Sequence, residues 1–209
     1  MPHETTDLLA DEPPFWNEHL HKIPWCEDTR RKADLIREEL TTFIRQYRPF
    51  MPYPKYGDLY RNTWDAFPLS NFQGEYLELS EDNLEVPIQP LVKLFRARLP
   101  TTVSTIADLE EQGHLRNVFV SKLTPGSVIK PHRGWTPDYM RIHLCVVEDS
   151  ECRITVGTET RTWRQGELLA FKDGGPFAHS VEHRGTHERI VVSYDLHLDY
   201  VSRFIPEAR

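Results

Sequence analysis

Residues 140–146 read MRIHLCV, in which apolar side chains alternate with polar or titratable ones. Successive side chains of a β-strand point to opposite faces of its sheet, so Ile142 and Leu144 share one face. Arg141 and His143 share the other face. Two interpretations of this polar face are open: a solvated outer surface, or the interior of a barrel that binds a polar ligand.

Two more segments offer a face that mixes polar with apolar side chains. Alternation places the following residues together, one set in each segment: Arg189, Val191, Ser193 and Asp195, and Phe119, Ser121 and Leu123. Alternate residues of a barrel strand point inward, and a polar ligand needs polar groups there. Three such faces therefore favour the barrel interpretation.

The region after Gly113 predicts a series of short strands separated by Gly and Pro turns. The alternating or β-branched runs are 115–123, 127–130, 140–147, 152–156, 160–163, 167–171, 179–182 and 189–197. Strands of this length and spacing are typical of a β-sandwich or a jelly-roll barrel.

Helices are expected before this region. After an irregular lead-in, apolar residues at three- and four-residue steps predict a helix from Asp28 or Thr29 to about Tyr47. A second helix is expected over 87–99. A capping box at Thr105–Asp108 would begin a short third helix, which Gly113 would end.

These patterns indicate one mainly β domain over residues 1–209. We expect a helical and loop elaboration over 1–112, packed against a jelly-roll core at 113–200. A chain of this length with 39% hydrophobic residues can bury one sizeable core.

Composition excludes several kinds of partner. A net charge of −7 without clustered Lys and Arg argues against nucleic-acid binding, and the apolar runs are too short to span a bilayer. The three cysteines, Cys26, Cys145 and Cys152, contain no Cys-x-x-Cys. We therefore expect buried, reduced thiols in a cytoplasmic protein with neither a nucleic-acid nor a membrane partner. The oligomeric state is left open.

Two histidines lie where a predicted strand meets a turn, His132 after Pro131 and His179 after Ala178. A neutral imidazole is a good ligand for divalent iron. Each could instead be an ordinary hydrogen-bonded residue, and His183 is a rival to His179 as a ligand.

Spaced polar residues follow one another in a defined order through the C-terminal part of the chain. They read Ser121-x3-Pro125-Gly126-x5-His132-x-Gly134, Arg141-x-His143-Leu144, Trp163-x2-Gly166-x4-Phe171, His179-x9-Arg189 and Asp195-x-His197. This arrangement, over about residues 115–198, resembles the aspartyl/asparaginyl β-hydroxylase domain. The N-terminal half matches only weakly, around residues 63–67 and on to Gly74.

The resemblance implies a double-stranded β-helix (jelly-roll) oxygenase that uses Fe(II), 2-oxoglutarate and O₂. It implies that His132 and His179 bind iron and that Arg189 binds the distal carboxylate of 2-oxoglutarate. The remaining cosubstrate contacts would be Ser121, Arg141 and His143, while Trp163 and Phe171 pack the barrel. The implied reaction hydroxylates a C–H bond and releases succinate and CO₂. Its substrate would be a small amino acid, a peptidyl residue or an amino-acid-derived metabolite that carries a carboxylate.

Two features depart from the usual pattern. Residues 172–176, KDGGP, are richer in glycine than the family's acidic segment before the second histidine. Gly134 stands where many non-haem iron oxygenases have a carboxylate ligand, so water would complete the metal shell, or a halide in a halogenase. Asp138, Asp173 and Glu182 are the nearest substitute ligands in the sequence, but none has the two-residue spacing from His132 that the common triad uses. Desaturation on the same iron scaffold, or metal binding without turnover, are further alternatives.

Overall fold

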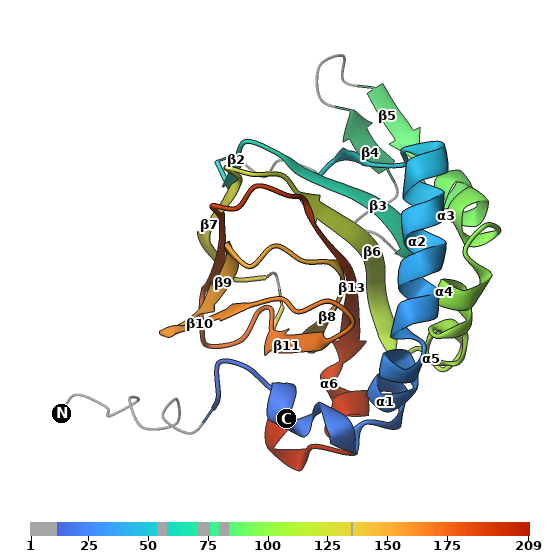
Figure 1. Ribbon diagram of the computed structural model, residues 1–209. Helices are drawn as coiled ribbons and strands as arrows, with labels where there is room; N and C mark the ends of the chain where they lie inside the picture. Colours follow the sequence, from blue (N-terminus) through green and yellow to red (C-terminus); the bar gives the residue numbers. More distant parts are fainter. Residues whose placement is uncertain (1–11, 54–57, 71–75, 80–83, 135) are drawn as a thin grey trace.

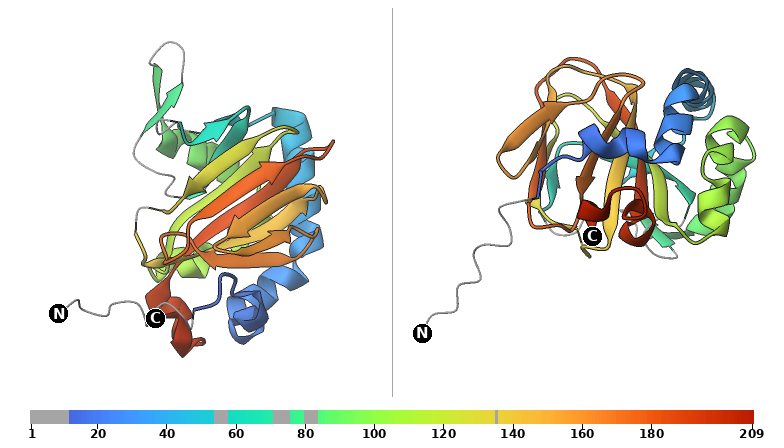
Figure 2. Two further views of the ribbon diagram at one scale, coloured as in Figure 1. Left: turned by 90° about the vertical axis from the view of Figure 1, so that its left-hand side faces the viewer. Right: turned by 90° about the horizontal axis from the view of Figure 1, so that it is seen from below.

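The computed structural model describes residues 12–209 except 54–57, 71–75, 80–83 and 135. Two antiparallel sheets face each other, and helices cover the outer face of one of them (Figures 1 and 2). The chain is therefore mainly β, a jelly roll with N-terminal helices packed against it, as its strand pattern predicts.

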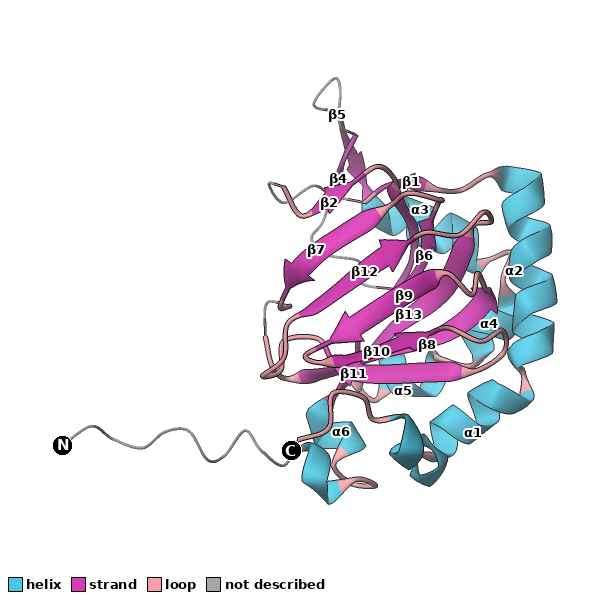
Figure 3. Cartoon of the chain, turned by 60° about the vertical axis from the view of Figure 1, so that its left-hand side comes forward, coloured by secondary structure: helices cyan, strands magenta, loops and turns pink. Residues whose placement is uncertain are grey.

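The larger sheet of the described residues has six strands. Their spatial order is β1 (Met51–Pro52), β3 (Trp64–Ser70), β6 (Leu115–Leu123), β13 (Arg189–His197), β8 (Tyr139–Val147) and β11 (Leu168–Lys172). The facing sheet (Figure 3) has the order β10 (Glu159–Thr162), β9 (Cys152–Val156), β12 (His179–His183), β7 (Val128–His132) and β2 (Tyr60–Arg61). A separate pair comprises β4 (Tyr76–Leu79) and β5 (Leu84–Pro87).

Most helices precede the core strands. The α-helices are α1 (Pro24–Arg31), α2 (Ala33–Tyr47), α3 (Ile88–Arg96), α4 (Pro100–Ser104), α5 (Ala107–Glu111) and α6 (Leu198–Val201), and the 3₁₀ helices are η1 (Asn17–Lys22) and η2 (Pro206–Ala208). α2 packs on β8, and α3 packs on β3.

Strands before Gly113 also join the barrel, which the sequence pattern does not predict. β1 and β3 extend the larger sheet, and β2 pairs with β7 in the smaller one. β1 and β2 have two residues each, too short to show a period. β3 is buried along almost its whole length, so it shows no apolar–polar alternation.

The helix expected up to Tyr47 is confirmed, but it is divided in two. α1 ends at Arg31 and α2 begins at Ala33, with Lys32 capping both. The predicted capping box is wrong. The Thr105 hydroxyl donates to the carbonyl of Thr102 at 2.7 Å, and α5 has no side-chain cap at its N-terminus.

The end of the short helix follows the prediction. Gly113 has a φ of 68°, and its N–H donates to the Glu110 carbonyl at 3.0 Å. A left-handed residue of this kind ends a helix readily when it is glycine.

Each face of the six-stranded sheet carries its own buried cluster. Ile142 and Leu144 belong to the cluster between the sheet and the helices, as do Ile190 and Val192. The opposite faces of the same strands point between the two sheets. The polar face of 140–146 is thus an interior surface, so the solvated-surface interpretation is wrong.

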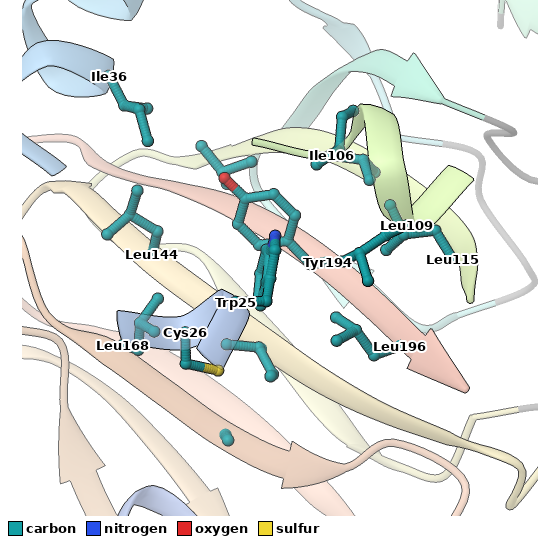
Figure 4. Close-up of a cluster of buried hydrophobic side chains, with 14 of the residues drawn as sticks. Trp25, Cys26, Ile36, Ile106, Leu109, Leu115, Leu144, Leu168, Tyr194 and Leu196 are labelled. Atoms are coloured by element: carbon teal, nitrogen blue, oxygen red, sulfur yellow. The ribbon is translucent and has the colours of Figure 1, made fainter. Parts of the chain in front are cut away.

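Trp25 of α1 is central to the helical cluster (Figure 4). Its ring lies edge-on to Tyr194 of β13 with centroids 4.9 Å apart, and its indole N–H donates to the Thr105 carbonyl at 2.6 Å. Full burial of a large apolar side chain contributes about 1.5–3 kcal/mol, so this cluster anchors the helices to the sheet.

Trp16 and the first residue of η1, Asn17, cover the edge of β11. The N–H of Trp16 donates to the Ala170 carbonyl at 2.8 Å, and the Asn17 side chain bonds to the backbone of Leu168 and Ala170. An uncovered edge strand can pair with another chain, so this segment protects the larger sheet there.

All three cysteines are buried and unpaired, as expected for packing thiols. Within the described residues, no helix is long and apolar enough to cross a membrane.

Candidate active site

His132 and His179 lie side by side on neighbouring strands. His132 ends β7, His179 begins β12, and the two residues are partners in the ladder between these strands. Their ring centroids are 4.2 Å apart. The two strand ends therefore bring together the two histidines that the sequence predicts as metal ligands.

The backbone fixes one ring nitrogen of His132, and burial determines the charge of His179. His132 Nδ1 lies 2.8 Å from the Lys130 carbonyl oxygen, which orients the ring and leaves Nε2 for a ligand bond. Burial lowers the pKa of His179 well below its ordinary value, with smaller contributions from His132 and Arg141. His179 is therefore neutral near pH 7, the form that binds metal.

His183, the rival ligand, faces a different neighbourhood. Its Nδ1 accepts the Gly185 N–H at 3.3 Å. The next residue of this turn, Thr186, donates its backbone N–H to the Asp149 carboxylate. His183 does not line the cavity that contains His132 and His179. The geometry therefore favours His179 over His183.

A carboxylate from another loop lies beside the histidines. Asp173 Oδ1 is 3.4 Å from His179 Nε2 and 2.5 Å from Arg141 Nη1. A Cβ added at Gly134 would be only 1.9 Å from Asp173 Oδ2. Asp173 thus uses the space that a side chain at position 134, the usual third-ligand position, would need. Asp138 and Glu182 are exposed residues outside the cavity lining.

Arg141 is already compensated by carboxylates. Its Nε and Nη2 donate to the two carboxylate oxygens of Asp195 at 2.8 and 2.9 Å, and its Nη1 pairs with Asp173. Asn117 donates to the same Asp195 carboxylate at 3.2 Å. Arg141 therefore links Asp173, which lies beside His179, to Asp195 near the end of β13.

Arg189 is buried without such compensation. Its Nη1 lies 3.4 Å from both the carbonyl and the hydroxyl oxygen of Ser121, the thiol of Cys152 lies within hydrogen-bonding reach of the guanidinium, and its Nε has no hydrogen-bond partner among the described residues. Its guanidinium lies over the Trp163 ring at 4.7 Å. Burial lowers the pKa of Arg189, with Cys152 and Cys145 acting in the opposite direction. No described Asp or Glu pairs with it.

Two tryptophans bond to the predicted cosubstrate residues. The Trp64 indole N–H donates to Ser121 Oγ at 3.1 Å, and the Trp163 indole N–H donates to His143 Nδ1 at 3.2 Å. Sequence reasoning gave Trp163 a packing role only and did not select Trp64 at all. Trp64 lies in the weakly matching N-terminal half, and residues 63–67 were the only signal that pointed to it.

One narrow cavity between the sheets, with a volume of about 40 Å³, brings all six predicted site residues together. Its lining comprises Ser121, His132, Arg141, His143, His179 and Arg189, with Trp64, Phe119, Ile129, Ile154, Trp163, Phe171 and Val181. A larger surface groove of about 960 Å³ lies beside β10 and α1. Three of its four arginines, Arg30, Arg153 and Arg161, already pair with neighbouring glutamates, so the internal cavity is the stronger candidate.

Comparison with known proteins places this site in a family. The profile of the aspartyl/asparaginyl beta-hydroxylase family matches residues 30–198. Aspartate beta-hydroxylase domain-containing protein 2 of Xenopus tropicalis is 37% identical over 83 residues, which cover 38% of this chain and 22% of that protein. Aspartyl/asparaginyl beta-hydroxylase of Homo sapiens is 35% identical over 77 residues, 36% of this chain and 10% of that protein. The aligned segment is thus less than a quarter of either relative's length.

Solved structures show more distant likenesses. A Pseudomonas putida prolyl-4-hydroxylase aligns with a TM-score of 0.46 at 15% identity, over 79% of this chain and 86% of its own. A predicted oxalate decarboxylase from Thermotoga maritima aligns with a TM-score of 0.35 at 17% identity, over 42% and 71%. The family profile covers most of the chain, including every residue of the cavity, and the chain therefore belongs to the aspartyl/asparaginyl β-hydroxylase family.

Proposed function

We propose that this chain is an Fe(II)- and 2-oxoglutarate-dependent dioxygenase. It would hydroxylate an unactivated C–H bond of an amino acid, a peptidyl residue or an amino-acid-derived metabolite and release succinate and CO₂. Membership of the family supports a hydroxylase of the oxygenase type. The metal and the cosubstrate are inferred from the residues that line the cavity, and the substrate class is inferred from the family resemblance.

The unpaired Arg189 is the observation that carries the proposal. A buried guanidinium without a counter-ion is costly, and an anionic ligand would offset that cost. The guanidinium has planar donors that suit a carboxylate, and it lies in the same cavity as the paired histidines. A molecule with a carboxylate at one end and metal-binding oxygens at the other matches the chemical groups at the two ends of this cavity, and 2-oxoglutarate is such a molecule.

The histidine pair fits a divalent iron. His132 Nε2 is left free by the bond of Nδ1 to a backbone carbonyl, and His179 is neutral. Only two histidines supply nitrogen ligands, so positions remain for oxygen ligands. Bound iron would supply the oxygen chemistry, and the protein's own residues bind, orient and exclude water.

Each part of the cavity has a separate task in this proposal. Arg189, Ser121 and His143 would hold the distal carboxylate, while aromatic neighbours such as Phe119 and Phe171 exclude water. Arg141 orients Asp173 beside His179 by the ion pair between them. Asp173 would then accept a hydrogen bond from water or substrate at the metal end.

Asp173 favours hydroxylation over halogenation. A halide at the metal would need the space that a carboxylate normally fills as the third protein ligand, after the two histidines. Here an acidic side chain lies beside that space, held by Arg141. Like charges repel each other, so a halide is disfavoured there.

The test uses the purified chain with Fe(II), 2-oxoglutarate and O₂ and a panel of amino acids, peptides and amino-acid-derived metabolites. We expect succinate to form and one product to gain the mass of one oxygen atom. The His132→Ala variant is the control, and it should form neither. Chloride in the product would indicate a halogenase, and failure of the metal-loaded protein to bind 2-oxoglutarate would refute the proposal.

A further inference from the structure

Two side chains at the Arg189 end of the cavity can act either as hydrogen-bond donors or as acceptors. A neutral imidazole carries one proton, on Nδ1 or on Nε2, and a serine hydroxyl combines one proton with two acceptor positions. His143 and Ser121 are these two groups, and both line the cavity. Which atoms present protons to a ligand decides what the site binds.

At His143, the hydrogen bond from Trp163 determines which ring nitrogen carries the proton. An indole N–H can only donate, and it lies 3.2 Å from Nδ1 of His143. Nδ1 must therefore be the unprotonated nitrogen, and the ring proton is on Nε2. Burial, reinforced by Arg189 and Arg141, lowers the pKa of His143 well below its ordinary value, so the ring stays neutral.

At Ser121 the corresponding donor is Trp64. Its indole N–H lies 3.1 Å from Ser121 Oγ, and Arg189 Nη1 approaches the same oxygen at 3.4 Å. These two donors occupy the acceptor positions of the hydroxyl oxygen. The hydroxyl proton is left available to a ligand in the cavity.

We propose that Trp64 and Trp163 are positioning residues that make Ser121 and His143 obligate donors toward the cavity. With the guanidinium of Arg189, the anion end then presents protons only, from three different groups. Such an end accepts a carboxylate and rejects an isosteric carboxamide, whose NH₂ would meet other donors. The proposal rests on the proposed function only for the identity of the ligand, because the proton positions are properties of the free protein.

Trp25 provides a matched comparison. It is also buried, and its indole N–H also makes one internal hydrogen bond, to the Thr105 carbonyl at 2.6 Å. That bond lies in the cluster between the helices and the sheet, away from the cavity. A Trp25→Phe variant therefore loses a similar structural interaction without changing any donor at the anion end.

The first experiment measures the tautomer of His143 by two-bond ¹H–¹⁵N correlation spectra of the free protein. We expect the Nε2–H tautomer in the wild type and in Trp25→Phe. In Trp163→Phe, where Nδ1 loses its donor, a several-fold larger fraction of Nδ1–H tautomer should appear. A wild-type His143 protonated on Nδ1, or equal fractions in the Trp163→Phe and Trp25→Phe variants, would overturn the proposal. The wild-type measurement decides even if a variant fails to fold.

The second experiment measures binding of 2-oxoglutarate and of 2-oxoglutaramate, its distal carboxamide, by calorimetry with Mn(II) in the site. Trp163→Phe and Trp64→Phe should each weaken 2-oxoglutarate binding by about tenfold, because the hydrogen bond from His143 or Ser121 to the charged distal carboxylate is weakened. Each variant should also reduce the ratio of the affinity for 2-oxoglutarate to the affinity for the carboxamide. Trp25→Phe should leave both unchanged. Equal losses in all three variants would reduce the tryptophans to packing residues. If the wild type binds neither compound, the proposed function fails while the tautomer result still stands.

Discussion

Burying a guanidinium without a carboxylate is unfavourable, and Arg189 is the residue at which this chain does so. Arg141 shows the contrast within the same cavity, because Asp195 and Asp173 compensate its charge. A buried arginine with only a structural role would be expected to have carboxylate partners within the chain, as Arg141 has. Arg189 therefore points to a ligand that the chain itself does not contain.

The first residue-scale prediction concerns Arg189→Ala. The affinity for 2-oxoglutarate should fall by about 2–5 kcal/mol, because the variant leaves one carboxylate of the ligand unpaired in a partly dry pocket. Calorimetry with Mn(II) in the site measures this loss. Arg153→Ala, at an exposed position of β9, is the control and should bind normally. Unchanged affinity in Arg189→Ala would place the cosubstrate elsewhere.

The metal ligands give the second prediction. His132→Ala and His179→Ala should each abolish binding of Mn(II) or Fe(II) while the far-ultraviolet circular dichroism spectrum stays that of the wild type, since cavity-lining ligands contribute little to the core. His183→Ala should retain metal binding, because His183 lies outside the cavity lining. Loss of metal in His183→Ala together with retention in His179→Ala would show that the assignment is reversed.

Gly134 and Asp173 should be coupled, which is the third prediction. In Gly134→Ala the new Cβ would meet the Asp173 carboxylate, so the side chain must leave Arg141 and stability should fall by about 1–3 kcal/mol. In an Asp173→Gly background the same alanine should cost far less. Urea unfolding of the four proteins gives the coupling energy. Additive effects would mean that the carboxylate does not use the space beside Gly134.

At the scale of elements, Asp149 joins the β8–β9 loop to the β12–β13 loop. Its buried carboxylate accepts the N–H groups of Glu151, Thr186 and His187 at 2.8–2.9 Å. Burial alone would raise the pKa of Asp149, but these backbone donors outweigh it and hold the pKa below the ordinary value. A carboxylate with a depressed pKa stabilises the fold above its unfolded-state pKa of about 3.9.

The fourth prediction follows from the lowered pKa of Asp149 in the folded protein. Asp149→Asn should lower the free energy of unfolding by about 1–3 kcal/mol at pH 7, because the amide cannot accept all three backbone bonds. The difference from the wild type should shrink as the pH falls through the folded-state pKa of Asp149, where the wild-type carboxyl becomes neutral. Urea unfolding at a series of pH values measures it. A difference that is constant down to pH 2 would contradict the assigned role.

The same scale shows how far the sequence alone predicts this fold. The core strands and their inward faces were predictable, because β6, β8 and β13 each keep an alternation that a half-polar interior imposes. β3 has no such alternation because both its faces are buried, and β1 and β2 are too short to show one. The division between α1 and α2 was not predicted, because apolar spacing continues across Lys32.

The site was only partly predictable for a related reason. The resemblance supplied His132, His179 and Arg189, and the structure brings them into one cavity. The approach of Asp173 to the place beside Gly134 depends on the path of the β11–β12 loop, which no local pattern encodes. The partnership of Trp64 with Ser121 depends on β3 pairing with β6 across the sequence.

At the scale of the whole molecule, the two faces of the six-stranded sheet have different roles. The outer face of the six-stranded sheet packs on the helices, and the space between the sheets contains the histidines and the cavity arginines. His132 lies at the end of β7 and His179 at the start of β12, and Arg189 lies at the start of β13. Chemistry and cosubstrate anchoring are thus assigned to two ends of one narrow cavity.

A crystal structure of the chain with Mn(II) and 2-oxoglutarate under anaerobic conditions tests this account most directly. It predicts metal–nitrogen bonds of about 2.0–2.2 Å to His132 and His179 alone among the protein's side chains. It also predicts the distal carboxylate on Arg189, Ser121 and the Nε2 of His143, with Asp173 close to the metal but not bonded to it. A carboxylate oxygen of Asp173 within bonding distance of the metal would contradict the two-histidine site, and 2-oxoglutarate bound away from Arg189 would contradict the proposed function.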